Sequence, residues 1–239
     1  MQEDGIKTAI ASGRPYFAAA PVITNLGINA AGCFNTGALL FDPSTNKTIS
    51  SKPLDSDVVN ELIEFARKTD THLELYTGDQ YLIECKATYT EYHTRYLGVP
   101  PVVGAFECTD ALSVLKAMLV YEDRDTERAQ LVDALREHLP DHGFAIGHGA
   151  DKPELNFCSV VAPGACKQQA FEQLLDYHNL NAANVMAIGD ADSDIPFIQQ
   201  AGVGVAMGNA RPHVQREADL VTGHVDEGGL AQVLAAVRC

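Results

Sequence analysis

Strand-like and helix-like segments alternate at both ends of the chain, and this alternation constrains the fold more than any other feature. Near the start, an apolar segment at 6–11 precedes a helical pattern over 15–26, which begins at a proline favoured in the first turn of a helix. From 155 onward, apolar strand-like segments alternate with helical patterns up to the last residues. Such alternation predicts an α/β fold with a parallel sheet and right-handed crossovers.

The middle of the chain has a different pattern, typical of an α+β unit with hairpins. Its predicted elements are a helix over 55–68, paired strands at 72–77 and 81–85, a strand at 114–121 and a helix over 125–138. We therefore expect this block to be inserted into the parallel-sheet domain. The expected division is a first part of that domain at 1–52, the insertion at 53–155 and a second part at 156–239.

Charge and composition exclude several classes of partner. The chain has 17 basic and 32 acidic residues, a formal net charge of −15, which argues against nonspecific binding to nucleic acid or to an anionic membrane surface. No apolar run approaches the roughly 20 residues of a membrane span, and the opening MQEDG lacks the basic and apolar pattern of a secretory signal. We expect a cytoplasmic protein whose cysteines, none in a CxxC pair, are reduced thiols. Its oligomeric state stays open.

Three aspartates follow directly after the predicted strand at 184–188. They are Asp190, Asp192 and Asp194, and in an open parallel sheet ligands bind beyond the carboxyl ends of the strands. Carboxylates this close repel one another unless a cation lies between them. Oxygen ligands of this kind suit Mg²⁺, so the run predicts a magnesium site. The alternative is an acidic helix N-terminus that uses one aspartate as its cap.

Two other segments have features of an anion site. Ser12 and Gly13 offer a hydroxyl and an amide at the end of the first predicted strand, just before a helix start, where unpaired N–H groups favour negative charge. Lys167 opens a later helix, where a cation opposes the helix dipole, so we expect a partner anion beside it. The alternatives are an ordinary helix cap at Ser12 and a solvated lysine.

Taken together, these segments resemble the haloacid dehalogenase superfamily of phosphohydrolases, in particular its Cof-type members with a type IIB cap. ASGRP is similar to the second motif of that superfamily, Lys167 in APGACK to the third and GDADSD to the fourth. The segments FNTGALLFDP and AGVGVAMGNARPHVQREADLVT also resemble stretches of the family. The resemblance covers nearly the whole chain, and the order and spacing of the motifs make it more specific than any one of them.

The resemblance implies a fold and an activity. The fold is α/β, a Rossmannoid parallel-sheet core with an inserted α+β cap of type IIB. The activity is that of a Mg²⁺-dependent phosphatase, acting on small phosphorylated metabolites such as sugar phosphates or phosphorylated cofactors. In phosphoryl transfer, cations and hydrogen-bond donors cancel the charge on the phosphoryl oxygens. A cap that closes over the site excludes water during that step.

The resemblance also implies roles for individual residues. Ser12 and the Gly13 amide would bind the transferring phosphoryl group, and Lys167 would neutralise it. Asp190 would ligate Mg²⁺, while Asp194 would either support the metal shell or pair with Lys167. Three further residues are candidates for substrate contacts, namely Ser193, where the family often has asparagine, and Asn35 and Asn209. For the two asparagines, a purely structural role in turns is the alternative.

One part of the family pattern is missing. The nucleophilic aspartate of this superfamily belongs to an Asp-x-Asp-Gly-Thr-like motif at the end of its first strand, and no DxDG run occurs in the 239 residues. We therefore expect that the first core strand is absent, that the chain is truncated at its N-terminus and that it is inactive as written. The alternative is a catalytically dead module that binds a phosphorylated metabolite. A response-regulator receiver is disfavoured by the long insertion.

Overall fold

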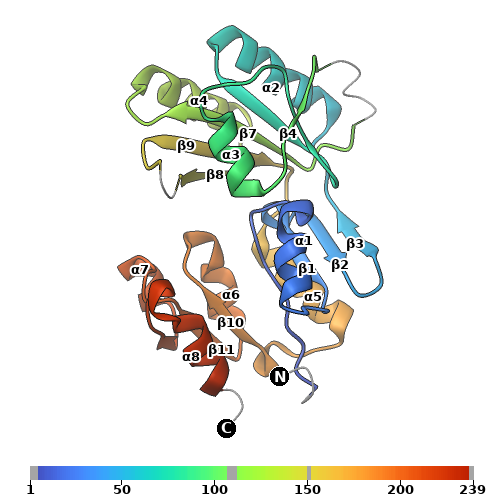
Figure 1. The fold of residues 1–239 in the computed structure, drawn as a ribbon, viewed down its shortest axis with the longest axis vertical. Helices are drawn as coiled ribbons and strands as arrows, with labels where there is room; N and C mark the ends of the chain where they lie inside the picture. The colour runs from blue at the N-terminus through green and yellow to red at the C-terminus, as the bar shows by residue number, and fades with distance from the viewer. Residues whose placement is uncertain (1–4, 107–111, 150–151, 237–239) are drawn as a thin grey trace. The chain divides into compact units, whose positions relative to one another are not determined.

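The computed structural model describes residues 5–106, 112–149 and 152–236. The chain forms two compact units, which we describe separately (Figure 1). The parallel-sheet unit consists of Met1–Thr8 and Lys167–Cys239, and the mixed-sheet unit is Ala9–Cys166. No helix in the described ranges is long and apolar enough to cross a membrane.

The parallel-sheet unit alternates strands and helices, as the sequence predicts. Its elements are α5 (Lys167–His178), β10 (Met186–Gly189), α6 (Ile195–Gln200), β11 (Val203–Ala206), α7 (Pro212–Arg216), β12 (Leu220–Val221) and α8 (Gly229–Ala236). The strands form a parallel sheet in the order β10-β11-β12. No described strand pairs with the other edge of β10. Because β10 ends at Gly189, the aspartates that follow lie at the carboxyl end of the sheet.

The core of this unit is small. Ile198 of α6 packs with Ala206 of β11 and Val214 of α7, and all three are at most 2% exposed. Phe171 of α5 contacts Phe197 of α6 with ring centroids 5.2 Å apart. The close spacing between α6 and β11 depends on Gly204, because a Cβ there would lie 2.1 Å from the Ile198 carbonyl oxygen. These contacts fix α6, and with it the loop that carries the aspartates.

The mixed-sheet unit contains two sheets. Its elements are α1 (Tyr16–Asn25), β1 (Gly32–Phe34), β2 (Leu39–Asp42), β3 (Lys47–Ser51), α2 (Ser56–Thr69), β4 (His72–Tyr76), β5 (Tyr81–Ile83), α3 (Thr90–Leu97), β6 (Val102–Val103), β7 (Lys116–Glu122), α4 (Thr126–His138), β8 (Gly143–His148) and β9 (Leu155–Val161). The first three strands form an antiparallel sheet, and the other six pair in the order β6-β5-β4-β7-β9-β8. All pairs in the larger sheet are antiparallel except β5 with β6.

The central strands β4 and β7 of the larger sheet are buried on both faces, and successive residues of each strand point to opposite sides. Leu73 and Leu75 of β4 pack in the cluster that includes α2 and α4. Tyr76 of β4 packs in a second cluster with Leu97 of α3. On α2, the residues Val59, Leu62, Ile63 and Ala66 are buried at helical spacing, which is why this segment forms an amphipathic helix.

The strand at 155–161 differs from expectation. The alternation predicts that it returns the chain to the parallel sheet, but β9 pairs antiparallel with β7 and β8. A short apolar run does not specify the direction of its partner strand, and here the partner is β7 in the register Leu119↔Cys158. The predicted division at 52/53 and 155/156 stays a prediction.

Other local expectations are refined by the structure. The segment 6–11 forms no strand, and its pairing is confined to a parallel bridge between Ala11 and Cys33 with two adjacent backbone hydrogen bonds. The stretch 87–97, ambiguous in sequence, is helical from Thr90. The predicted loop 98–107 contains the short strand β6, and its last residue lies outside the described ranges.

Candidate functional site

A buried ion pair lies at the start of α5 in the parallel-sheet unit. Lys167 Nζ lies 2.5 Å from Asp194 Oδ1, and the two side chains are only 8% and 11% exposed. Lys167 is the first residue of α5, and Asp194 ends the 3-10 helix Asp192–Asp194 that follows β10. A lysine at a helix N-terminus is unfavourable by itself, and this carboxylate is the partner anion that the sequence led us to expect.

The second oxygen of Asp194 organises the loop after β10. Asp194 Oδ2 accepts hydrogen bonds from the backbone N–H groups of Asp190 at 3.2 Å and Ala191 at 3.1 Å. The loop can approach this closely because residue 189 is glycine, since a Cβ at Gly189 would lie 2.4 Å from Asp194 Cβ. Both oxygens of Asp194 are therefore engaged by the protein itself.

Asp190 is held differently and faces solvent. One of its oxygens, Oδ2, accepts a hydrogen bond from Asn209 Nδ2 at 3.0 Å, and Asn209 Oδ1 in turn accepts from the Val225 amide at 3.1 Å. Asp190 is exposed, as is Ser193 in the adjacent 3-10 helix. The structure thus brings Asp190 and Asn209 into direct contact, and it leaves the Ser193 hydroxyl at the surface.

The chemistry of these donors fits Mg²⁺ at Asp190 better than at Asp194. Mg²⁺ keeps several waters and takes one or two protein carboxylates together with substrate phosphate. Asp190 presents an exposed carboxylate, whereas Asp194 is buried and already accepts three hydrogen bonds. Within the described residues, no group of three or more His, Cys, Asp or Glu side chains forms a ready-made metal cage. Of the two predicted ligands, Asp190 is the one that presents an exposed carboxylate.

The third aspartate of the run, Asp192, forms surface contacts instead. It pairs with His213 at the start of α7, and Arg211 Nη1 lies 3.8 Å from its Oδ2. All three side chains are at least 44% exposed. Sequence reasoning did not identify this pairing, because the contact depends on how α7 folds back toward the loop after β10.

In the mixed-sheet unit, hydrogen bonds to backbone groups hold the Ser12 loop in place. The Ser12 hydroxyl oxygen accepts a hydrogen bond from the Arg14 amide at 3.0 Å. The Ser12 amide donates to the Cys33 carbonyl at 2.8 Å, and the Ser12 carbonyl accepts from the Thr36 amide at 3.2 Å. Because its oxygen is already an acceptor, the hydroxyl keeps its hydrogen free to donate to an incoming anion.

Asn35 lies beside this loop in an unusual state. Its side chain is fully buried, yet neither Oδ1 nor Nδ2 has a hydrogen-bond partner in the described chain. Its backbone amide donates to the Arg14 carbonyl at 3.0 Å. The backbone at Asn35 and Thr36 is left-handed, with φ of 49° and 62°, which is costly for a β-branched threonine. Buried amides without partners are rare, so Asn35 is a candidate for ligand contact.

Sequence reasoning missed a buried lysine next to the same loop. Lys116 begins β7, is 3% exposed and donates a hydrogen bond from Nζ to the Gly13 carbonyl at 3.0 Å. Its ammonium also lies 4.3 Å from the centroid of the Tyr76 ring. Burial lowers the pKa of Lys116 to about 8, although the charge of Glu74 acts in the opposite direction. No sequence pattern could have found it, because Lys116 and Gly13 are 103 residues apart.

Glu74 on β4 is a buried carboxylate whose charge acts on Lys116. Tyr76 Oη donates to it at 2.5 Å, His93 Nδ1 lies 2.8 Å from Oε2, and His72 Nε2 lies 3.5 Å from Oε1. Burial by itself would raise the pKa of Glu74, but these partners lower it to about 2. The Tyr76 hydroxyl has a pKa well above its usual value, because burial and the Glu74 charge both disfavour its ionisation.

The candidate residues thus form two groups. Lys167, Asp190, Asp194 and Asn209 are linked within the parallel-sheet unit. Ser12, Gly13 and Asn35 are linked within the mixed-sheet unit, and Lys116 joins them. Ser193 belongs to the first group by position alone. The roles of all these residues stay predictions.

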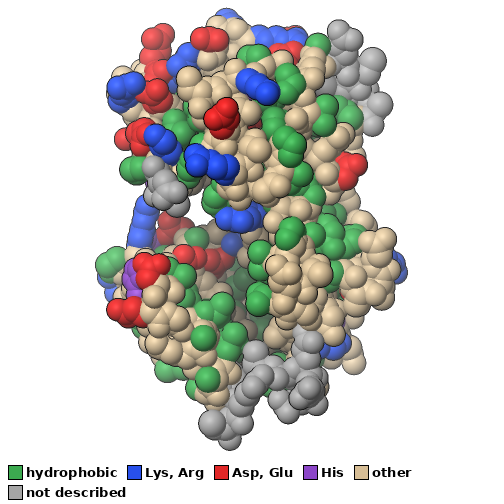
Figure 2. Space-filling view, in the orientation of Figure 1, with side chains coloured by type: hydrophobic (Ala, Val, Ile, Leu, Met, Phe, Trp, Pro, Cys, Tyr) green, Lys and Arg blue, Asp and Glu red, His purple; other side chains and the backbone are tan. Residues whose placement is uncertain are grey.

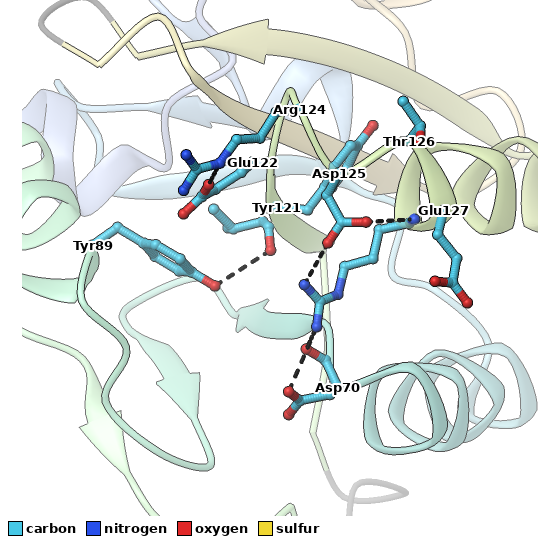
Figure 3. Close-up of a pocket in the computed structure, with 10 residues that line it drawn as sticks. Asp70, Tyr89, Tyr121, Glu122, Arg124, Asp125, Thr126 and Glu127 are labelled. Carbon is cyan, nitrogen blue, oxygen red and sulfur yellow. Dashed lines mark hydrogen bonds and ion pairs between the residues drawn. The ribbon is translucent and has the colours of Figure 1, made fainter.

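A cavity of about 550 Å³ in the mixed-sheet unit contains none of the predicted residues. Both arginines that line it are already paired, Arg124 with Glu122 and Arg128 with Asp125 and Asp70, and Tyr89 Oη donates to the Val120 carbonyl (Figure 3). Because its cations are neutralised by neighbouring carboxylates, this cavity offers no free positive charge for a phosphate. We therefore do not assign the site to it.

The surface agrees with the charge balance of the sequence. On the face shown in Figure 2, over α3, β7 and α4, basic and acidic side chains are interspersed and form no continuous basic patch. Exposed pairs such as Arg124–Glu122 contribute to this pattern. That face therefore lacks the footprint that a nucleic-acid backbone requires.

A comparison of sequences places the chain among hydrolases. A family model described as haloacid dehalogenase-like hydrolase matches residues 1–234. A relative from Bacillus subtilis (strain 168), the 5-amino-6-(5-phospho-D-ribitylamino)uracil phosphatase YitU, is 25% identical over 245 residues, which cover 98% of this chain and 86% of the relative. The match therefore extends over both units.

Solved structures share the fold. A haloacid dehalogenase-like hydrolase from Bacteroides thetaiotaomicron has a TM-score of 0.85 at 24% identity, covering 99% of this chain and 88% of that one. A sugar phosphatase of haloacid dehalogenase subclass IIB has a TM-score of 0.80 at 20% identity, covering 99% of this chain and 87% of that one. At these identities the likeness shows the mixed α/β fold.

Proposed function

The chain belongs to the haloacid dehalogenase-like hydrolase family, and on that premise we propose that it is a Mg²⁺-dependent phosphatase for small phosphorylated metabolites. The substrate class is sugar phosphates or phosphorylated cofactors. Relatives support this class, because one is named for a phosphoribityl substrate and a structure of the same fold is a sugar phosphatase.

The observation that carries the proposal is the buried Lys167–Asp194 pair next to the exposed Asp190. Asp194 holds the ammonium with one oxygen and the backbone of the Asp190 loop with the other. It thereby keeps a cation and an exposed carboxylate in fixed positions at the carboxyl end of β10. Groups fixed in advance around a developing charge stabilise it without reorganisation during the reaction.

Asp190 would hold the metal, with Asn209 fixing the orientation of its carboxylate. When bound, Mg²⁺ would neutralise charge on the phosphoryl oxygens. Lys167 would contribute a second positive charge, and Ser12 would donate its hydroxyl hydrogen to a phosphoryl oxygen. Asn35, whose amide group has no partner in the described residues, would contact the substrate.

The sequence of residues 1–239 contains no DxDG run, so no aspartate in it matches the nucleophile that the family resemblance implies. We therefore expect these residues by themselves to bind a phosphorylated ligand without hydrolysing it. The purified 239-residue chain with Mg²⁺ should release no p-nitrophenol from p-nitrophenyl phosphate. Clear turnover that Lys167→Ala abolishes would show that this aspartate is not required.

Binding tests the rest of the proposal. Calorimetry should detect inorganic phosphate binding that strengthens with Mg²⁺, and Asp190→Asn should remove the Mg²⁺ effect while binding without metal persists. Asp192→Asn is the matched control, because Asp192 lies in the same loop but pairs with His213 at the surface. Equal loss of the Mg²⁺ effect in both variants would contradict the role of Asp190.

A second candidate is a module that senses a phosphorylated metabolite and does no chemistry. In such a module, the cationic and hydroxyl groups of these residues would bind the phosphoryl group without hydrolysing it. The two candidate functions predict different selectivity among phosphorylated ligands. A sensor should bind one sugar phosphate far more tightly than inorganic phosphate, whereas a phosphatase that binds mainly the phosphoryl group should show similar affinity for several esters.

A further inference from the structure

We propose that Lys116 is a positioning residue that acts on the Ser12 hydroxyl through the Gly13–Arg14 peptide group. The proposal rests on the proposed function in one respect, namely that Ser12 contacts the phosphoryl group. It assigns to the larger sheet of the mixed-sheet unit a direct part in preparing the anion site, through a residue that no motif of the sequence marks.

The proposal starts from a continuous row of hydrogen bonds. Lys116 Nζ donates to the Gly13 carbonyl at 3.0 Å, and the Arg14 N–H of the same peptide group donates to Ser12 Oγ at 3.0 Å. A cation on the carbonyl polarises the peptide, so its N–H becomes a stronger donor. A hydroxyl that accepts a stronger hydrogen bond becomes a stronger donor in turn, and its free hydrogen is the one available to a phosphoryl oxygen.

The ammonium is fixed where this row begins. Lys116 pairs in the sheet with Tyr76 on β4, and Lys116 Nζ lies 4.3 Å from the centroid of the Tyr76 ring. The Tyr76 hydroxyl is itself held by Glu74 at 2.5 Å. In the chain as described, the Gly13 carbonyl is the only acceptor of a Lys116 hydrogen bond, and no carboxylate forms an ion pair with it. The lysine is therefore buried at 3% exposure without a salt bridge.

A buried lysine without a salt bridge is unfavourable for folding, because desolvation penalises the charged form. A methionine or leucine would fill the same space in the sheet without that cost. Retention of a charge that opposes folding, in contact with the predicted phosphate loop, indicates a use outside folding. The same loop is also held from α3, where the Arg14 guanidinium lies 4.0 Å from the centroid of the Tyr96 ring.

A double-mutant cycle tests whether Lys116 acts through Ser12. The ligand is sulfate, a tetrahedral dianion that does not titrate near neutral pH, and binding to the 239-residue chain is measured by calorimetry at pH 7. Ser12→Ala should weaken binding by about tenfold, the value of one charge-assisted hydrogen bond. Lys116→Met should weaken it by about fivefold, and adding Lys116→Met to Ser12→Ala should cost less than about twofold.

The pH profile separates this role from a structural one. The titratable groups that face the ammonium are Glu74 and Tyr76 on β4. The pKa of Glu74 is lowered to about 2 and that of Tyr76 is raised well above its usual value, so neither group changes its charge between pH 7 and 9.5. The wild-type chain should lose sulfate affinity between pH 7 and 9.5 as Lys116 loses its proton. The affinity of Lys116→Met should lack this loss, because the variant has no proton to lose at this position. Lys68→Met is the control, since Lys68 is exposed at the end of α2.

The outcomes are distinguishable. If Ser12→Ala leaves sulfate binding unchanged, the proposed role of Ser12 fails, and this inference fails with it. If Ser12→Ala weakens binding but the two substitutions are additive, or if Lys116→Met keeps the wild-type pH profile, only the inference about Lys116 is overturned. Thermal melting of each variant shows whether the fold is retained.

Discussion

Asp194 in the parallel-sheet unit and Glu74 in the mixed-sheet unit are both buried carboxylates, but the protein stabilises them by different means. Asp194 lies at the end of a parallel strand and has a lysine at 2.5 Å together with two backbone N–H groups. Glu74 lies inside β4 and is surrounded by a tyrosine hydroxyl and two histidine rings, and no lysine or arginine of the described ranges forms an ion pair with it.

The difference reflects where each carboxylate lies. Asp194 is next to the exposed loop that carries Asp190, and Lys167 balances its charge in a buried pair that is neutral overall. Glu74 is 1% exposed among aromatic side chains, and the hydrogen bond that it accepts from Tyr76 holds that ring next to Lys116. Asp194 is thus balanced by a cation beside a loop, whereas Glu74 is stabilised by hydroxyl and imidazole groups inside a sheet.

The largest effect is expected when the lysine of the first pair is removed. Lys167→Met leaves the Asp194 carboxylate buried and unpaired, which should lower the free energy of unfolding by about 3–5 kcal/mol. Urea denaturation measures this loss, and the double variant Lys167→Met/Asp194→Asn should recover most of it. Lys152→Met is the matched control, because its pair with Glu154 is about half exposed. An equal loss of unfolding free energy in Lys167→Met and Lys152→Met would show that burial of the ion pair makes no difference to stability.

Acid should remove the stabilisation that Glu74 provides. Its pKa is lowered in the folded chain to about 2 from 4.5, so its contribution is fully present above about pH 4.5 and is lost as the pH falls toward 2. The shift corresponds to about 3 kcal/mol. Wild-type and Glu74→Gln chains should therefore differ most in unfolding free energy near pH 6 and converge near pH 2.5. A difference in unfolding free energy that does not change with pH would show that ionisation of Glu74 does not stabilise the fold.

Removing the buried lysine above Tyr76 should increase stability. The pKa of Lys116 is lowered to about 8 from 10.5, so the unfolded chain binds more protons between these values and stability rises with pH across them. Lys116→Met should raise the free energy of unfolding at pH 7 by about 1–3 kcal/mol, less the cost of an unpaired Gly13 carbonyl. The gain should shrink as the pH approaches 10.5. A loss of stability at pH 7 would mean that the lysine is structural.

The smallest effect is expected at an exposed pair. Arg124 Nε lies 2.5 Å from Glu122 Oε2, but the side chains are 84% and 43% exposed. Arg124→Ala should change the free energy of unfolding by less than about 0.5 kcal/mol, because exposed ion pairs are screened by water and salt. The same denaturation series provides the measurement, and a loss near that of Lys167→Met would erase the distinction between buried and exposed pairs.

Much of the local structure could be predicted from sequence because its causes are local. The helix α2 follows from apolar residues at helical spacing, and the β4–β5 hairpin from two strand patterns around a short polar turn. The aspartate run after β10 was placed correctly, since a buried strand and the loop after it are adjacent in the chain. The direction of β9 relative to its neighbours could not be predicted, because it depends on pairing with β7 and β8 rather than on the sequence of β9 itself.

The sequence by itself determined the order of the elements, the motifs and the expectation that Lys167 needs an anion. The tertiary structure decided that Asp194 is this anion while Asp190 faces solvent, and that Lys116 meets the Gly13 carbonyl. The physical reason is the range of the forces involved. Helix and strand patterns depend on near neighbours, whereas the partner of a buried charge is chosen by packing between segments that are 27 or 103 residues apart.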